Sequence, residues 1–316
     1  MNLNYLCQQP DVACTGKELM KKILITGASG LLGKEVLKQL KERTEYEVYA
    51  VTRNRMRLDE YTDIHVIECD LIAEPRRENL MESIKPDILL HLAWNQEDAS
   101  FRMSNTNLLW LNISISLLYL FEQYGGKRFL FAGSSSEYDG SDGVMHEAVD
   151  VLPVSLYGLC KKAFNKFAKE YCRRGEIKYV GMRLFTIYGE DDTHSFGAIP
   201  SAIRLLLENE ELICDSPDTT RDYIYSADAA SVILQLIDHS FTGIVNVASG
   251  NARSMREVFQ CIGNVSRKAQ YVKMAESSLE SKRFEADIHL LKRLGISGYD
   301  SDFEKNIKEI IQKRKT

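Results

Sequence analysis

Tyr157 and Lys161 are the residues of this 316-residue chain whose types and spacing first indicate chemistry. They stand four places apart in P-V-S-L-Y-G-L-C-K-K (153–162), where a proline precedes a helical pattern, so both side chains are expected on one helix face. A tyrosine beside an ammonium group can act as a general acid or base, because the charge stabilises its phenolate. The same pair also occurs by chance on solvated helix faces, so the rest of the sequence has to decide.

A serine-rich loop, A-G-S-S-S-E-Y-D-G (132–140), comes shortly before this helix, with Ser135 22 residues ahead of Tyr157. The loop follows an apolar segment that is predicted to be a strand. Ligands of doubly wound sheets bind beyond the carboxyl ends of the strands. Serine-rich loops are otherwise ordinary turns, so this one indicates a site only in combination with the helix.

A glycine turn, T-G-A-S-G-L-L-G (26–33), directly follows the first predicted strand and opens a predicted helix. The N–H groups and the positive dipole end of such a helix N-terminus suit a pyrophosphate. The sequence therefore predicts a dinucleotide site here. Its expected cofactor-binding residues are Gly27, Ser29, Gly30, Leu31, Leu32 and Gly33.

Arg53 follows the second predicted strand, where NAD-binding proteins usually carry an acidic residue for the ribose 2′-hydroxyl. An arginine can pair with a 2′-phosphate instead. We therefore favour NADP(H) as the cofactor and leave NAD(H) open. Residues after the third and fourth strands are expected to line the same cofactor: Asp70, Leu71, Leu92 and Ala93.

Short apolar runs alternate with amphipathic stretches along most of the chain. The predicted strands are 21–26, 47–52, 65–70, 87–93, 128–133 and 179–185, and the predicted helices include 31–43, 107–125, 154–172 and 285–295. Apolar strands separated by helices are typical of a parallel sheet covered on both faces. The predicted fold class is α/β, a Rossmann-like doubly wound parallel sheet with a smaller C-terminal substrate-binding lobe.

The predicted domain organisation follows from the same alternation of apolar runs and amphipathic stretches. We expect an N-terminal extension over 1–19 and a dinucleotide-binding domain over 20–185, to which 223–248 return. The substrate-binding lobe is expected to comprise 186–222 and 249–316.

The composition is that of a soluble globular protein, with 44% hydrophobic and 27% charged residues and a formal charge of −5. A mildly acidic balance argues against nucleic acid as a partner. Apolar runs fall short of the ~20 residues that a membrane span needs. Seven dispersed cysteines without a C-x-x-C pair favour reduced thiols in the cytoplasm and no metal site.

Taken together, the glycine turn, the serine loop and Y-G-L-C-K (157–161) closely resemble the extended short-chain dehydrogenase/reductase family. Three further segments carry the resemblance: M-R-L-F-T-I-Y-G (182–189), R-D-Y-I-Y (221–225) with Asp228, and N-V-A-S-G (246–250). The resemblance implies an NAD(P)-dependent enzyme that acts on nucleotide-diphosphate sugars.

The resemblance also implies roles for individual residues. Tyr157 matches the general acid/base, and Lys161 its partner, which also grips the nicotinamide ribose. Ser135 aligns with the residue that hydrogen-bonds the reacting sugar oxygen, with Ser134 and Ser136 as close competitors. Asn112 matches an asparagine that supports the cofactor, or is a polar residue on an exposed helix face. The expected substrate contacts are Ser136, Glu137, Thr186 (where the family commonly has Asn) and Arg221.

Several reactions fit this residue set. Our main prediction is an NADPH-dependent reductase of a 4-keto deoxysugar nucleotide, with Tyr157 as the general acid. The alternatives are an NAD-dependent 4-epimerase, a 4,6-dehydratase, or a non-catalytic NADP-binding regulator. A dehydratase would want two acids after the serine, whereas this loop offers only Glu137, which can instead brace the loop. The helices 107–125 and 154–172 either pair in a homodimer or face the core.

Overall fold

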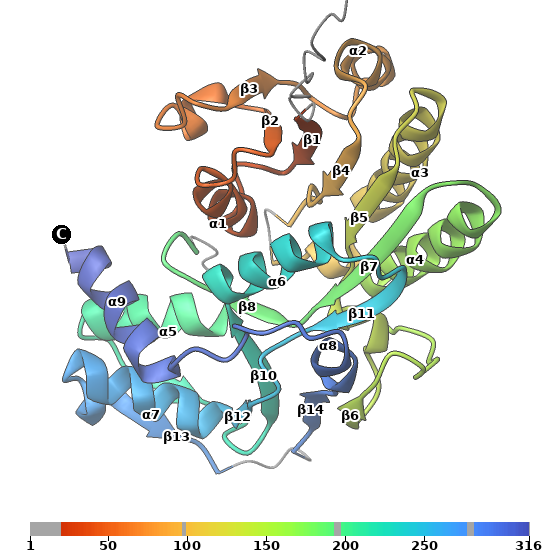
Figure 1. Ribbon diagram of the computed structural model, residues 1–316. Helices are drawn as coiled ribbons and strands as arrows, with labels where there is room; N and C mark the ends of the chain where they lie inside the picture. Colours follow the sequence, from red (N-terminus) through yellow and green to blue (C-terminus); the bar gives the residue numbers. More distant parts are fainter. Residues whose placement is uncertain (1–19, 97–98, 193–196, 277–280, 316) are drawn as a thin grey trace, which may run out of the picture.

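A seven-stranded, fully parallel sheet is the centre of the molecule (Figure 1). The computed structural model describes residues 20–96, 99–192, 197–276 and 281–315. From one edge to the other the strands are β11 (Gly243–Val247), β7 (Lys178–Leu184), β5 (Arg128–Ala132), β4 (Ile88–His91), β1 (Lys21–Thr26), β2 (Tyr46–Thr52) and β3 (His65–Glu68). The predicted fold class is confirmed.

Helices cover both faces of this sheet because its strands are apolar on both sides. Along β1, Ile23 and Ile25 pack into one core with α1 (Leu31–Leu40) and α6 (Ser226–Asp238). Leu24, between them, packs into a second core on the other face, which three further helices cover. These are α2 (Glu74–Ile84), α3 (Thr106–Gln123) and α4 (Leu156–Arg174). This alternation is the period of two that a strand imposes on its side chains.

The direction of the strand order reverses between β1 and β4, which are direct neighbours. On one side of this point the chain continues to β2 and β3, and on the other to β5, β7 and β11. Ligands of open α/β sheets bind at the carboxyl ends of the strands beside such a reversal. The glycine turn after β1 and the serine loop after β5 both lie at that edge.

A second group of strands joins segments that are far apart in the sequence. A five-stranded sheet contains β12 (Ala252–Ser254), β10 (Thr220–Tyr225), β14 (Arg283–Ala286), β6 (Gly143–Met145) and β8 (Thr186–Tyr188), and a separate pair joins β13 (Val272–Met274) to β9 (Leu212–Cys214). A third core packs around them with α5 (Ala198–Leu207), α7 (Met255–Ser266) and α9 (Phe303–Lys315). Figure 1 shows these helices gathered at one end of the molecule, away from β3 and α2.

Four single turns of 3-10 helix complete the described elements: η1 (Arg55–Leu58), η2 (Phe101–Met103), η3 (Ser135–Tyr138) and η4 (Ala269–Tyr271). The helix predicted over 285–295 is wrong in part. Residues 283–286 form strand β14, and only α8 (His289–Arg293) is helical. The predicted domain limits stay a prediction, and the extension 1–19 lies outside the described residues.

Candidate functional site

The turn between β1 and α1 requires glycine at two of its three glycine positions. Gly27 has a φ of +71°, and a Cβ there would lie 2.7 Å from the Ala93 backbone nitrogen. A Cβ at Gly33 would lie 2.3 Å from the Gly27 carbonyl oxygen. Gly30 is exposed and begins α1 without a side-chain cap. The turn is thus closed toward the protein and open toward a ligand, as a pyrophosphate cradle must be.

The end of β2 lies directly beside this turn. The Thr52 hydroxyl donates to the Ser29 hydroxyl over 2.9 Å, which fixes the turn to the second strand. Arg53 is exposed and follows immediately. The sequence pattern did not indicate a carboxylate in this loop. Glu68, at the end of β3, accepts a hydrogen bond from the Arg55 amide over 3.1 Å. The loop therefore presents both signs of charge.

The ends of β3 and β4 supply backbone to the same edge. Leu92 and Ala93 are tied to Thr26 of β1, because the Leu92 amide donates to its carbonyl and the Ala93 amide to its hydroxyl over 3.3 Å. Leu71 is buried, and its carbonyl accepts a 2.6 Å bond from the Arg77 guanidinium. Asp70 accepts from a backbone amide two residues further on. These contacts fix the floor on which a cofactor would lie.

His91, at the end of β4, is completely buried beneath this floor. Its Nδ1 lies 2.6 Å from the Thr26 hydroxyl, and its Nε2 lies 2.9 Å from the Ser114 hydroxyl on α3. Burial, with a smaller contribution from Lys161, lowers the pKa of His91 to about 3. It therefore acts as a neutral bridge between β1, β4 and α3.

Asn112 is exposed on α3, which agrees with the alternative interpretation of a polar residue on an exposed helix face, and the cofactor role stays a prediction. The buried asparagine of this helix is Asn107, five residues earlier. Its side-chain oxygen accepts from the Trp94 indole over 2.8 Å, and its amide donates to the carbonyls of Phe101 and Ser104. It holds the segment between β4 and α3 in place, a contact that no local sequence pattern indicated.

Tyr157 lies in the first turn of α4, whose N-cap is Ser155. The tyrosine is 5% exposed, forms a hydrogen bond with the Ser134 side chain, and accepts a 2.8 Å bond from the Gln96 amide. Burial raises the pKa of its phenol to about 12, whereas Ser134, Arg102 and Gln96 each lower it. The structure thus brings Tyr157 against the serine loop, as the sequence predicted.

Within that loop Ser134 is the serine whose side chain lowers the pKa of the Tyr157 phenol. Ser134 caps the short helix η3 and accepts from the Ser136 amide over 3.1 Å. Ser135 is the first residue of η3 and is half-buried. The choice of Ser135 as the residue that contacts the reacting sugar oxygen stays a prediction, and Ser134 is the neighbouring candidate that acts on the phenol.

Lys161 follows on the same face of α4 and is 2% exposed. Its ammonium donates to the Ala132 carbonyl over 2.6 Å and lies 3.9 Å from the centre of the Trp94 ring. Desolvation lowers the pKa of this ammonium to about 7, although Glu137 raises it. The lysine therefore lies beside Tyr157, and its ammonium gives up its proton more readily than that of an ordinary lysine.

Glu137 is held by other groups of the protein. Its side chain is fully buried, and its oxygens accept from Ser134 N (3.1 Å), Asn165 Nδ2 (2.6 Å) and Arg183 Nε (2.9 Å). These three bonds support the bracing role that the sequence left open for Glu137, and the substrate contact stays a prediction. Ser136 is also buried, and its hydroxyl accepts a 2.8 Å bond from Arg102.

Thr186 and Arg221 come from the second sheet and are both exposed. Thr186 pairs in register with Tyr223, two residues after Arg221. Residues two apart on a strand share a face, so the structure brings these two predicted substrate residues into one patch.

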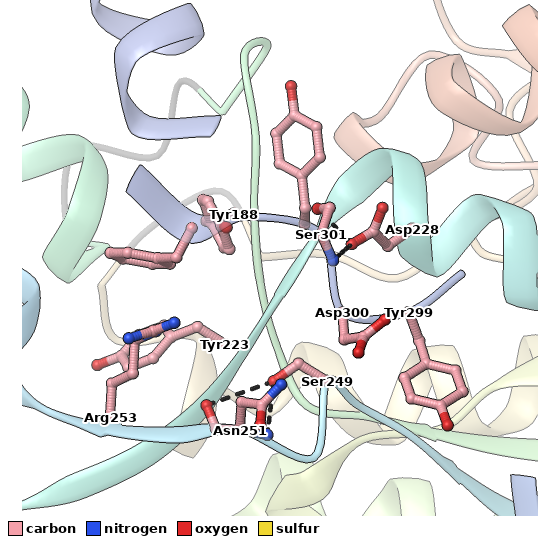
Figure 2. A pocket seen from close by; sticks show the side chains of 11 residues that line it. Tyr188, Tyr223, Asp228, Ser249, Asn251, Arg253, Tyr299, Asp300 and Ser301 are labelled. Carbon is pink, nitrogen blue, oxygen red and sulfur yellow. Dashed lines mark hydrogen bonds between the residues drawn. The ribbon is translucent and has the colours of Figure 1, made fainter. Parts of the chain in front are cut away.

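The other segments of the family resemblance build a separate region (Figure 2). A pocket of about 20 Å³ is lined by eleven residues, and it adjoins a cleft of about 380 Å³. Figure 2 shows Asp228 pointing to Ser301, whose amide donates to it over 2.9 Å. Asp222 accepts three bonds, from the Ser249 amide and hydroxyl and from the Gly250 amide. Among the described residues, none that we predicted for catalysis or cofactor binding lines either cavity.

Two kinds of feature are absent from the described residues. Across them, no helix has both the length and the apolar character needed to cross a bilayer. Within the same ranges, no three His, Cys, Asp or Glu side chains gather as ligands for a metal ion.

Solved structures with a closely similar fold cover nearly the whole chain. The UDP-N-acetylglucosamine 4-epimerase from Methanobrevibacter ruminantium, in complex with UDP-N-acetylmuramic acid, has a TM-score of 0.82 and 20% identity over 93% of this chain and 98% of its own. The Thermus thermophilus UDP-glucose 4-epimerase in complex with NAD gives 0.81 and 22% over 93% and 99%. The dTDP-glucose 4,6-dehydratase from Bacillus anthracis in complex with NAD gives 0.80 and 17% over 93% and 96%.

A family assignment comes from the sequence itself. The sequence model of the NAD dependent epimerase/dehydratase family matches residues 23–248, which run from β1 through β11 and include the glycine turn, the serine loop and α4. The chain therefore belongs to the NAD dependent epimerase/dehydratase family.

Proposed function

We propose that this protein is a nucleotide-sugar 4-epimerase that uses NAD. The observation that carries the proposal is the buried contact of Tyr157 with Ser134, beside Lys161 and without an available carboxylate. This set can remove a proton from a sugar hydroxyl and return it, which is the proton chemistry that inversion at C4 requires. Similar folds in 4-epimerase structures support the choice.

The glycine turn fits the cofactor's pyrophosphate, because the missing Cβ atoms of Gly27 and Gly33 leave room only for backbone. Residues of the turn, Leu92 and Ala93 would hold the nucleotide, and Lys161 would hold the ribose next to the nicotinamide. When bound, NAD would supply the acceptor for the hydride of the sugar C4 and the donor for its return. The protein's own contribution is to place the sugar hydroxyl against Tyr157 and to keep water away from it.

Tyr157 accepts the proton of the C4 hydroxyl as the carbonyl forms and returns it when the carbonyl is reduced. Ser134 hydrogen-bonds the same sugar oxygen and keeps it in line with the phenol. Because Tyr157 approaches the sugar from one side, the 4-keto sugar must turn over between the two transfers for the configuration to change. Lys161 stabilises the phenolate from the next turn of α4.

A dehydratase is disfavoured by the state of Glu137. Elimination of water needs an acid that can reach the sugar, and this carboxylate is enclosed by Arg183, Asn165 and the Ser134 amide. The 4-keto reductase that we predicted from the sequence is kept as the second candidate. The exposed basic residues Arg53, Arg55 and Arg57 favour it, since they would suit NADP(H).

We further propose that the substrate is a nucleoside-diphosphate sugar. Arg221 and Thr186, exposed on one patch of the second sheet, would hold the diphosphate and the adjoining sugar. An arginine suits a diphosphate because its planar fork donates two parallel hydrogen bonds. Two structures with a similar fold, a Thermotoga maritima UDP-glucose 4-epimerase and MoeE5, are complexes with UDP-glucose and with UDP-glucuronic acid, respectively.

A homodimer through α3 and α4 is also proposed. Both helices expose large apolar side chains, among them Leu108, Tyr119, Leu159 and Phe167. Light scattering at micromolar concentration would give twice the monomer mass, and Tyr119→Lys would reduce it. The cytoplasmic location stays a prediction.

The proposed reaction is tested with the purified protein and a panel of UDP- and dTDP-linked hexoses. We expect NAD to co-purify and C4 epimers to interconvert with no net change in absorbance at 340 nm. Stoichiometric loss of NADPH with a 4-keto sugar nucleotide would show that the reductase is correct instead.

A further inference from the structure

We propose that the segment between β4 and α3 provides a second means of activating Tyr157: Gln96 as a catalytic hydrogen-bond donor to the phenol oxygen, and Arg102 as a positioning cation beside it. The inference rests on the proposed function, in which Tyr157 transfers the proton. It adds to the roles of Ser134 and Lys161, and the sequence indicated neither Gln96 nor Arg102.

Gln96 contacts the reacting atom itself. Its amide nitrogen lies 2.8 Å from the Tyr157 oxygen, on a side chain that is half-buried at the site. A hydrogen bond to an ionised acceptor is roughly twice as strong as one to a neutral acceptor. The amide therefore favours the phenolate over the phenol, and it does so at every pH because it does not ionise.

Arg102 comes from η2 in the same segment. Its guanidinium donates to the Ser136 hydroxyl over 2.8 Å and to Asp139 over 3.3 Å. Asp139 also accepts a 2.7 Å bond from Ser155, the N-cap of α4. The cation is thus tied both to the serine loop and to the start of the helix that carries Tyr157, while 49% of its side chain stays exposed.

Phe101, next to Arg102, packs its ring edge-to-face on Tyr157 with centroids 5.1 Å apart. This contact holds η2 against the phenol. Phe101 and Gln96 both contact Tyr157, so the described residues on either side of this segment are fixed to it. A cation at position 102 therefore stays at a constant place relative to the phenol.

The usual partner, Lys161, is a weak activator in this protein. It already donates to the Ala132 carbonyl, and aromatic rings of Trp94 and Phe131 surround its ammonium. With its pKa lowered to about 7, it loses part of its charge at neutral pH. An arginine keeps its charge throughout this range, so Arg102 supplies a positive charge where part of the Lys161 population is neutral.

Three charged side chains act on Tyr157 from the elements around it. Arg102 from η2 favours the phenolate and Glu137 from η3 opposes it, and the Lys161 ammonium from α4 lies 5.6 Å from the centre of the Tyr157 ring. Arg183 neutralises much of the effect of Glu137 through their 2.9 Å ion pair. Asp139 reduces the effect of Arg102 in the same way. His91, below Lys161, is neutral and does not change this balance.

The test is the pH profile of kcat/KM for the full-length protein with NAD and the epimerised nucleotide sugar. Gln96→Leu is expected to move the limb on which activity rises with pH upward by about one unit, the size of shift that a hydrogen bond to a charged form produces. Arg102→Gln should move it upward by less, and Arg102→Lys should restore the wild-type position. KM for the sugar should change less than kcat.

Gln123→Leu is the matched control, since Gln123 is exposed at the end of α3. It should leave the profile unchanged. A second readout is the tyrosinate absorbance near 295 nm, taken as the difference between each protein and its Tyr157→Phe partner. In the Gln96→Leu background the titration assigned to Tyr157 should also move to higher pH.

Two outcomes separate the inference from the proposed function. If Tyr157→Phe keeps full activity, the proposed function fails. If Tyr157→Phe is inactive but Gln96→Leu leaves both the limb and the absorbance titration in place, or lowers the rate equally at every pH, only the role of Gln96 is wrong.

Discussion

The carboxyl edge of the parallel sheet and the region of Figure 2 use polar residues in opposite ways. At the sheet edge, Tyr157 and Lys161 are buried with pKa values displaced to about 12 and about 7. In the second region, Asp222 is buried and Asp228 is half-buried, and backbone amides and serine hydroxyls satisfy both carboxylates. Some family motifs therefore supply residues that can react, and others supply residues that hold the fold together. The two kinds differ in whether other groups of the protein already satisfy the polar atoms.

The largest expected effect is at the sheet edge. Tyr157→Phe removes the proton donor while keeping the ring, so kcat should fall by about 10²–10⁴-fold. Because the ring still packs between Phe101 and Trp94, thermal unfolding should be close to that of the wild type. Steady-state kinetics and calorimetry measure the two quantities. Activity above a tenth of the wild type would contradict the assignment.

Glu137→Gln should act on stability rather than on chemistry, although it lies in the serine loop. It leaves Arg183, only 5% exposed at its side chain, without its anion. Removing one partner of a buried ion pair typically costs about 3–5 kcal/mol. Urea unfolding should show a loss of this size. A folded variant of normal stability with no activity would instead indicate that Glu137 takes part in the reaction.

His91 should make stability fall in acid. Its pKa is lowered to about 3 in the folded protein, below its ordinary value near 6.5, so the unfolded chain binds the proton first. Stability is therefore unaffected above about pH 6.5 and is lost as the pH falls toward 3, by about 2 kcal/mol at pH 5 for this group. His91→Gln should remove this part of the difference between urea unfolding at pH 7 and pH 5. An unchanged pH difference would exclude the neutral bridge.

Asp222→Asn should give the smallest effect and serves as the counterpart in the second region. An asparagine keeps one acceptor oxygen for the Ser249 amide and hydroxyl but loses the acceptor of the Gly250 amide and the charge, which should cost about 1–3 kcal/mol. We expect kcat per folded molecule to stay within about twofold, since no bond to the sheet edge is lost. A large fall in kcat at normal stability would break the comparison between the two regions.

The glycine turn and the strands of the parallel sheet could be predicted because their signals are local. The positive φ at position 27 requires glycine, and each strand is a continuous apolar run. Strand β14 could not be predicted, since residue Phe284 pairs with Gly143, far away in the sequence. Its apolar residues fitted a helix equally well.

The serine loop shows the limit of motif matching. Three consecutive serines allow any of three alignments, and only the structure shows that Ser134 caps η3 and lowers the pKa of Tyr157. Gln96 and Arg102 reach the site through packing of η2 on α4, which no spacing encodes. Asn107 was missed for a related reason, because the sequence does not show which of the two asparagines of α3 is buried.

The central claim is that Tyr157 and Ser134 support inversion at C4 with the hydrogen returned to the same carbon. The most direct measurement uses a nucleotide sugar carrying deuterium at C4, incubated with the purified protein and analysed by mass spectrometry and proton NMR. We predict that both C4 epimers appear and that the deuterium stays at C4 in each. Loss of the deuterium from C4, or a 4-keto sugar or a one-way reduction in place of interconversion, would contradict the claim.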